Sequence, residues 1–136
     1  MLASDRSRVA RDMPTKILVV DDNRDICQVV ADMLAPTGAE VVSAFDGTEA
    51  LGLLDKASID LAIVDLLFAG PVSSDLVVQQ AKFRNCQVIT MSGTLASDRR
   101  GRDLQHPHIV KPFGTQQLVD LVAATLARKG RPSPVL

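Results

Sequence analysis

The run Lys16-Ile-Leu-Val-Val-Asp-Asp22 decides the fold of this 136-residue chain. Four apolar residues, three of them β-branched, follow one another without alternation and end at two acids. Such a strand is buried on both faces, as in a parallel sheet. In the next segment, apolar residues recur at spacings of three and four between Ile26 and Leu34, and Pro36 and Gly38 follow as stop signals. The stretch therefore predicts a strand followed by a helix, which is the repeating unit of an α/β fold.

The same alternation continues along the rest of the chain. Further strands are expected at residues 40–44, 60–64, 86–91 and 107–110, and further helices around residues 50–54, 74–80, 95–104 and 118–126. Ser73 or Ser74 is the expected cap of the third helix. Five strands that alternate with five helices predict a doubly wound, five-stranded parallel sheet with helices on both faces. The pattern alone does not fix the strand order, and the flavodoxin-like order 2-1-3-4-5 is the commonest at this size.

Length and composition indicate a single domain. With 46% hydrophobic and 23% charged residues, the chain can bury one core. Residues 1–14 lack hydrophobic periodicity and are expected to form a flexible N-terminal arm, residues 15–128 the folded domain, and residues 129–136 a C-terminal tail.

Charge and hydropathy narrow the choice of partners and compartment. Fifteen basic and 16 acidic residues give a net charge of −1, so nothing suggests direct binding of nucleic acid. No apolar run approaches the ~20 residues of a membrane span, and the N-terminus has no apolar signal region. Two cysteines are too few for a disulfide scaffold. We therefore expect a cytoplasmic domain without membrane insertion.

Polar residues stand at the carboxyl ends of the predicted strands, where sheets of this kind bind ligands. These strand ends carry Asp21 and Asp22, then Asp65, Ser92 and Lys111. Three clustered carboxylates repel one another and favour a cation, and a site with few protein oxygens and a phosphate partner suits Mg²⁺. A lysine and a serine hydroxyl can both bind an anion. The set predicts a phosphoryl group carried on an aspartate, with Mg²⁺ as the cofactor.

Four motifs resemble those of bacterial response-regulator receiver domains. They are Val19-Val-Asp-Asp-Asn23, Leu61-Ala-Ile-Val-Asp-Leu66, Met91-Ser-Gly93 and Val110-Lys-Pro-Phe113. The resemblance covers roughly residues 15–128 and implies the flavodoxin-like order. It also implies two-component signalling, in which a sensor histidine kinase or a histidine phosphotransfer protein donates the phosphoryl group.

The resemblance assigns a role to each residue of the site. Asp65 would be the phospho-acceptor, and Lys111 the phosphate-binding lysine, joined to Pro112 by a cis peptide bond. Ser92 would be the switch hydroxyl. The metal ligands would be the carboxylates of Asp21, Asp22 and Asp65 and the main-chain carbonyl of Leu67.

Several positions depart from the family pattern. Ala69 and Ser73 stand where the family usually has proline and glycine, and Leu67 and Thr94, which flank the expected phosphate, carry no charge. The stretches from residue 65 to 92 and from 92 to 111 are each shorter by roughly one helical turn, which predicts trimmed or displaced third and fourth helices.

The position of the family's switch aromatic is occupied by His108. Two interpretations remain open. His108 is either a half-solvated rim residue without a role, or a switch residue whose neutral ring enters the pocket that Ser92 vacates. In the second case activation would be harder at mildly acidic pH, because burying the imidazolium has a desolvation cost.

The leading functional hypothesis is therefore a phospho-accepting receiver that acts on a downstream protein and is an enzyme only toward its own phosphorylation and dephosphorylation. The chain ends at residue 136, so a single-domain response regulator is expected, with output through protein contact, phosphorelay or phosphate storage. One alternative is a Mg²⁺-dependent phosphohydrolase with an aspartate nucleophile, although the first strand lacks the Asp-x-Asp pattern of such enzymes. The other alternative is an interaction module that works without phosphorylation. A nucleotide-binding domain is disfavoured, because no glycine-rich loop follows the first strand.

Overall fold

The computed structural model describes residues 13–93 and 106–128. Within them, five strands form one parallel sheet in the order β2-β1-β3-β4-β5, as predicted. The strands are β1 (Lys16–Val20), β2 (Glu40–Ala44), β3 (Leu61–Asp65), β4 (Gln87–Ser92) and β5 (His108–Val110). The last three each begin one residue later than expected, and β3 and β4 end one residue later, on the functional side chains Asp65 and Ser92.

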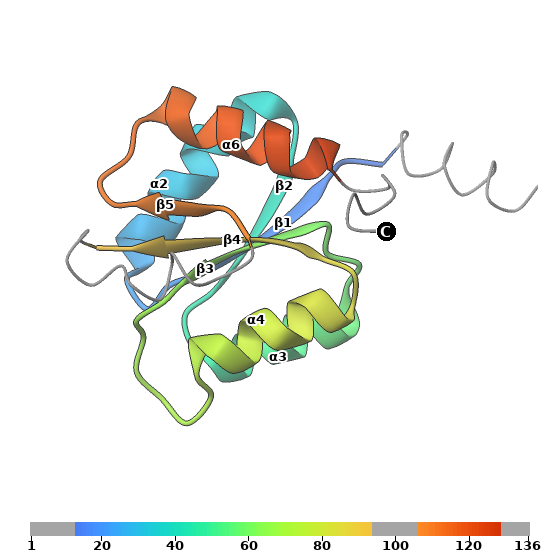
Figure 1. Ribbon diagram of the computed structural model, residues 1–136, viewed down its shortest axis with the longest axis vertical. Coiled ribbons are helices and arrows are strands. Elements are labelled where there is room, and N and C mark those ends of the chain that lie inside the picture. Colours follow the sequence, from blue (N-terminus) through green and yellow to red (C-terminus); the bar gives the residue numbers. More distant parts are fainter. Residues whose placement is uncertain (1–12, 94–105, 129–136) are drawn as a thin grey trace, which may run out of the picture.

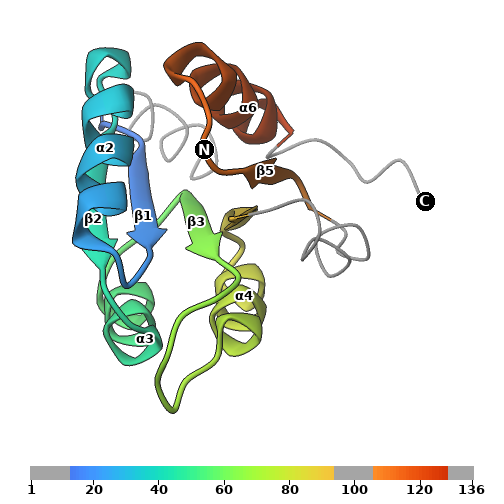
Figure 2. The same ribbon diagram turned by 90° about the vertical axis from the view of Figure 1, so that its left-hand side faces the viewer.

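Helices cover both faces of the sheet. The described residues contain α2 (Arg24–Leu34), α3 (Gly47–Lys56), α4 (Ser74–Phe83) and α6 (Thr115–Ala127), with a short 3₁₀ helix η1 (Ala35–Thr37) after α2. Helices α2 and α6 lie on one face, and α3 and α4 lie on the other (Figure 1), as the second view also shows (Figure 2). Four of the five predicted helices are thus present in the described part of the chain. The helix expected at residues 95–104 lies outside it, as do residues 1–12 of the predicted arm and the tail at 129–136.

The core consists of two apolar layers separated by the sheet. In β1, Ile17 and Val19 pack toward α2 and α6, whereas Leu18 and Val20 pack toward α3 and α4, and all four are fully buried. Alternate side chains of a strand point to opposite faces, so burial on both faces requires an unbroken apolar run. This is the physical reason that the run at 17–20 was informative.

Side-chain caps fix the start of three helices next to the carboxyl ends of the strands. The Asn23 carboxamide accepts hydrogen bonds from the first turn of α2, and the Asp46 carboxylate does the same for α3. At α4 the cap is Ser73, whose hydroxyl accepts a hydrogen bond from the Leu76 N–H at 3.2 Å. Each cap satisfies amide donors that the helix leaves unpaired.

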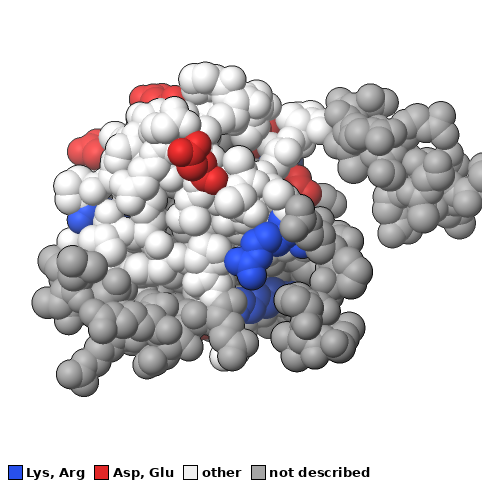
Figure 3. All heavy atoms as spheres, turned by 45° about the horizontal axis from the view of Figure 1, so that its top comes forward, with Lys and Arg blue, Asp and Glu red and all other residues white. Residues whose placement is uncertain are grey.

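The described helices are short, and the longest, α6, has 13 residues. Within residues 13–93 and 106–128, none has the length and apolar character needed to cross a membrane. On the face shown in Figure 3, acidic side chains are scattered singly and basic side chains form small groups, so the described part of this face carries both signs of charge.

Candidate functional site

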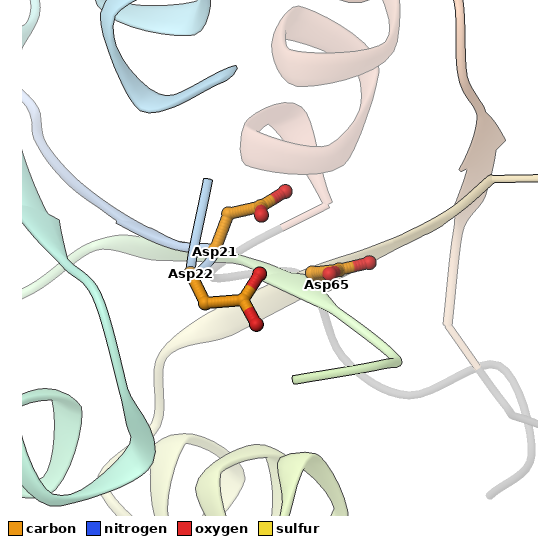
Figure 4. Close-up of side chains that lie close together, drawn as sticks. All are labelled: Asp21, Asp22 and Asp65. Atoms are coloured by element: carbon orange, nitrogen blue, oxygen red, sulfur yellow. The ribbon is translucent and has the colours of Figure 1, made fainter. Parts of the chain in front are cut away.

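Three carboxylates meet at the carboxyl ends of β1 and β3. Val20 pairs with Val64 in the parallel register, so Asp21, directly after β1, comes beside Asp65, the last residue of β3. One carboxylate oxygen from each of Asp21, Asp22 and Asp65 lies within 4.8 Å of the others. The three side chains lie close together, with the Asp21 and Asp22 carboxylates turned apart from adjacent positions (Figure 4). The cluster predicted from the sequence is therefore assembled, and its all-oxygen donor set suits a hard cation such as Mg²⁺.

Lys111 supplies a positive charge to this cluster. Its Nζ donates to Asp21 Oδ2 at 2.7 Å and lies 3.5 Å from Asp65 Oδ1. Burial alone would lower the pKa of this ammonium, but the hydrogen bond to Asp21 and the charges of Asp65 and Asp21 outweigh it and raise the pKa. The Lys111–Pro112 peptide bond is cis, as predicted.

Asp21 is the fixed member of the cluster. It is 1% exposed, and its second carboxylate oxygen accepts a hydrogen bond from the Asn23 N–H at 2.9 Å. Since Asn23 also caps α2, the start of this helix and the carboxylate hold each other in place. Asp22, in contrast, is exposed and can adjust to a ligand.

Asp65 has a strongly perturbed acidity. Burial and the neighbouring charge of Asp21 raise the pKa of its carboxyl from 3.8 to about 6, although Lys111 and a hydrogen bond from the Leu67 backbone act in the opposite direction. Near pH 7 the group is mostly ionised and carries a basic oxygen lone pair. A carboxylate with this pKa, beside a fixed cation, is suited to act as a nucleophile.

Ser92 and His108 lie side by side at the ends of β4 and β5. The Ser92 Oγ lies 2.9 Å from His108 Nε2, and the Thr90 Oγ1 lies 2.7 Å from His108 Nδ1. Ser92 is 1% exposed and His108 is half-buried. His108 is therefore hydrogen-bonded through both ring nitrogens, and its predicted entry into a pocket vacated by Ser92 remains a prediction.

A cleft of about 450 Å³ opens beside Asp22, on the loop between β3 and α4. Its lining includes Leu67 and Ala69, and the Leu67 side chain is 60% exposed. At the foot of the cleft the buried Ser74 hydroxyl donates to the Leu66 carbonyl at 2.8 Å. The Leu67 carbonyl stays a predicted metal ligand, and Thr94 lies outside the described residues.

One residue of this region was missed by the sequence analysis. The sequence pattern predicts only a strand position for Thr90, whereas in the structure it is fully buried and hydrogen-bonded to His108. A hydroxyl in the middle of a run that otherwise fills a core position was the available signal, because a buried hydroxyl needs a partner.

Comparison with known proteins identifies the class that this fold and site define. Residues 17–123 match the sequence model of the response regulator receiver domain. The regulatory protein VanRc of Enterococcus gallinarum is 31% identical over 122 residues, which is 88% of this chain and 53% of that protein. The transcriptional regulatory protein CpxR of Escherichia coli K12 is 31% identical over 116 residues, 83% of this chain and 50% of that protein. The chain thus spans about half the length of these relatives.

A solved structure shows the same architecture. The response regulator TrrA of Thermotoga maritima, in complex with Mg²⁺ and BeF, is 26% identical with a TM-score of 0.70, covering 82% of this chain and 98% of that one. The chain belongs to the response regulator receiver domain family of two-component systems. Members of this family bind Mg²⁺ at an acidic pocket, which corresponds to the cluster of Asp21, Asp22 and Asp65.

Proposed function

We propose that this domain accepts a phosphoryl group on Asp65 from the phosphohistidine of a sensor kinase or a histidine phosphotransfer protein. The observation that carries the proposal is the position of the Lys111 ammonium, which spans Asp21 and Asp65 above three clustered carboxylates. An ammonium in this position can neutralise an oxygen of a phosphoryl group carried by Asp65.

The transfer is a displacement at phosphorus. An ionised Asp65 oxygen forms the new O–P bond, the P–N bond to the donor imidazole breaks, and the imidazole leaves with the electron pair and takes up a proton. Asp21, Asp22, Asp65 and the Leu67 carbonyl would hold Mg²⁺, which neutralises charge on the phosphoryl oxygens. Lys111 holds one oxygen, and Ser92 donates a hydrogen bond to another.

The acyl phosphate shifts the domain between two states. Once Ser92 turns toward the phosphoryl group, the end of β4 and the neighbouring β5 change shape, and a downstream protein binds the changed surface. The domain is an enzyme only toward its own acyl phosphate, and we place this reaction in the cytoplasm. Direct contact with nucleic acid is not part of the proposal.

The test is intact-mass analysis after incubation with acetyl phosphate and Mg²⁺. The wild type should gain one phosphoryl group per chain, and Asp65→Asn should gain none. Asp120→Asn is the matched control, because Asp120 is exposed on α6 and accepts a hydrogen bond from Gln116, its neighbour on the same helix.

The same experiment separates the alternatives. Continuous turnover of a small phosphate ester, without a stoichiometric adduct, would indicate the phosphohydrolase. Full folding with no adduct on the wild type, from either acetyl phosphate or phosphoramidate, would indicate an interaction module and contradict the proposal.

A further inference from the structure

Thr90, His108 and Ser92 form a continuous chain of hydrogen bonds across two strands. His108 on β5 pairs in register with Thr90 on β4, and its ring reaches forward to Ser92, two residues further along β4. The backbone reinforces this pairing, since the Thr90 N–H donates to the Pro107 carbonyl at 3.0 Å and the Lys111 N–H donates to the Ser92 carbonyl at 2.7 Å.

These hydrogen bonds lie on the opposite face of the sheet from Asp65. Val88 packs with α3 and α4, whereas Ile89 and Met91 pack with α2 and α6, so alternation places Thr90 and Ser92 on the α3–α4 side. By the same alternation Asp65, two residues after Ile63, lies on the α2–α6 side. The bond to His108 therefore holds the Ser92 hydroxyl on the face away from the proposed phospho-acceptor.

Thr90, at one end of this set of hydrogen bonds, is held in the core. Thr90 is 0% exposed, in the middle of a strand that is paired on both sides by β3 and β5. Its hydroxyl therefore holds the His108 ring through Nδ1. The ring in turn holds the Ser92 hydroxyl through Nε2. This geometry holds for either tautomer of the ring, because hydroxyl groups can donate or accept.

We propose that Thr90 and His108 are positioning residues that together latch Ser92 in its resting place. Ser92 reaches a phosphoryl group on Asp65 only after its bond to His108 breaks, so the latch sets the fraction of molecules ready to switch. The inference rests on the proposed function, because it supposes that Ser92 moves when Asp65 is phosphorylated.

If this latch exists, removing its hydrogen bonds should favour the switched state. In Thr90→Val the side chain keeps its shape, but His108 Nδ1 loses its partner and the ring turns toward water. The binding-competent fraction then rises, and apparent affinity rises with it. One hydrogen bond is worth roughly 3- to 10-fold in such an equilibrium.

The experiment is a titration with beryllium trifluoride, a phosphoryl mimic, at saturating Mg²⁺. The chain has no Trp or Tyr, so binding is followed by the NMR signals of the Gly93 and Val110 amides. Thr90→Val should bind the mimic roughly 3- to 10-fold more tightly than wild type. Thr90→Ser, which keeps the hydroxyl, should restore the wild-type affinity, and His108→Phe should bind at least as tightly as Thr90→Val.

A double variant distinguishes the latch from a general packing effect. If Thr90 acts through His108, adding Thr90→Val to His108→Phe should change affinity no further, whereas a packing effect would persist. His108→Phe also keeps the test open if Thr90→Val does not fold. Equal or weaker affinity of the folded single variants, or full additivity in the double variant, would overturn the latch.

The Mg²⁺ affinity measured without the mimic separates this inference from the proposed function. It should be the same in wild type and all latch variants, because neither Thr90 nor His108 belongs to the carboxylate cluster that would hold the ion. Failure of the wild type itself to take up the mimic or a phosphoryl group would overturn the proposed function. A wild type that does both, with variants that match it, would overturn the latch alone.

Discussion

At the scale of single residues, Asp65 is a carboxylate whose ionisation opposes folding. Its pKa is raised to about 6 by burial and by the charge of Asp21. The folded protein therefore binds more protons than the unfolded chain between about pH 4 and pH 6, and stability falls as the pH rises through this window. Below the window the group is neutral in both states and has no effect, and above it the full destabilisation is present.

Asp65→Asn should for this reason stabilise the metal-free protein at pH 8. The shift corresponds to a gain of about 1–3 kcal/mol in the free energy of unfolding, which should shrink toward zero near pH 4. Urea denaturation in EDTA at both pH values measures the gain. Asp120→Asn, the exposed control, should change stability by less than about 0.5 kcal/mol at either pH. A gain that is independent of pH would show that ionisation of Asp65 does not oppose folding.

The charge of Lys111 stabilises the folded state, because it neutralises the buried carboxylate of Asp21. Removing its charge in Lys111→Met leaves Asp21 buried without a cation, which should lower the free energy of unfolding by about 2–4 kcal/mol. Lys16→Met is the matched control, because the Lys16–Glu40 pair is partly exposed, with its charged atoms 3.7 Å apart, and its removal should lower the free energy of unfolding by less than about 1 kcal/mol. Both are measured by urea denaturation in EDTA, and similar losses in the two variants would contradict this description.

The charged residues of the site were predictable from the sequence. The hydrogen bonds among its uncharged residues, such as that between Thr90 and His108, were not. Acids and a lysine at strand ends converge once the strand order is known, so Asp21, Asp65 and Lys111 could be placed from the sequence. The bond between Thr90 and His108 depends on the register of β4 against β5 and on a ring rotamer. Neither property is encoded in hydrophobic periodicity.

At the scale of elements, the start of α3 packs tightly against the loop between β3 and α4, which carries Leu67. A Cβ on Gly47 would lie 2.4 Å from the Val72 carbonyl oxygen and 2.7 Å from Val72 Cγ1. No side chain fits there unless the loop moves. Gly52, in the same helix, has nothing within 4 Å of such a Cβ and is its natural control.

Gly47→Ala should therefore destabilise the domain by about 1–3 kcal/mol. Gly52→Ala should stabilise it by about 0.5–1 kcal/mol, because alanine restricts the unfolded chain and favours the helix. Because Gly47→Ala displaces the loop with the proposed Leu67 ligand, it should also weaken Mg²⁺ binding, which calorimetry measures. Unchanged stability and Mg²⁺ affinity in Gly47→Ala would contradict this expectation, because they would show that the loop can move aside at no cost to folding or to metal binding.

The elements themselves were largely readable from the sequence. Unbroken apolar runs predicted β1 and β3, and a largely apolar run predicted β4. A cap was predicted only for α4, and Ser73 and Ser74 could not be told apart. Both serines precede the apolar positions, and only the structure shows Ser73 capping the helix while Ser74 bonds to Leu66. The contact between Gly47 and Val72 was not predictable, since it joins the start of α3 to a loop whose course no periodic pattern describes.

At the scale of the whole molecule, the acidic cluster links metal binding to stability. In EDTA, Asp22→Ala should be at least as stable as wild type, because one repelling carboxylate is gone. Mg²⁺ at a hundred-fold excess over its dissociation constant should add about 2.7 kcal/mol to the wild type and much less to the variant. Thermal melts with and without Mg²⁺ measure both values, and identical Mg²⁺ responses in the two proteins would contradict the assignment of Asp22 as a ligand.

The central claim is that Asp65 carries the phosphoryl group, and the most direct test is to locate that group. The protein is treated with phosphoramidate, whose P–N bond resembles that of phosphohistidine, and Mg²⁺, then digested and sequenced by tandem mass spectrometry after reductive trapping of the acyl phosphate. We predict a single modified position, Asp65, absent when EDTA replaces Mg²⁺. Modification at Asp21 or Asp22 with Asp65 unmodified would contradict the account.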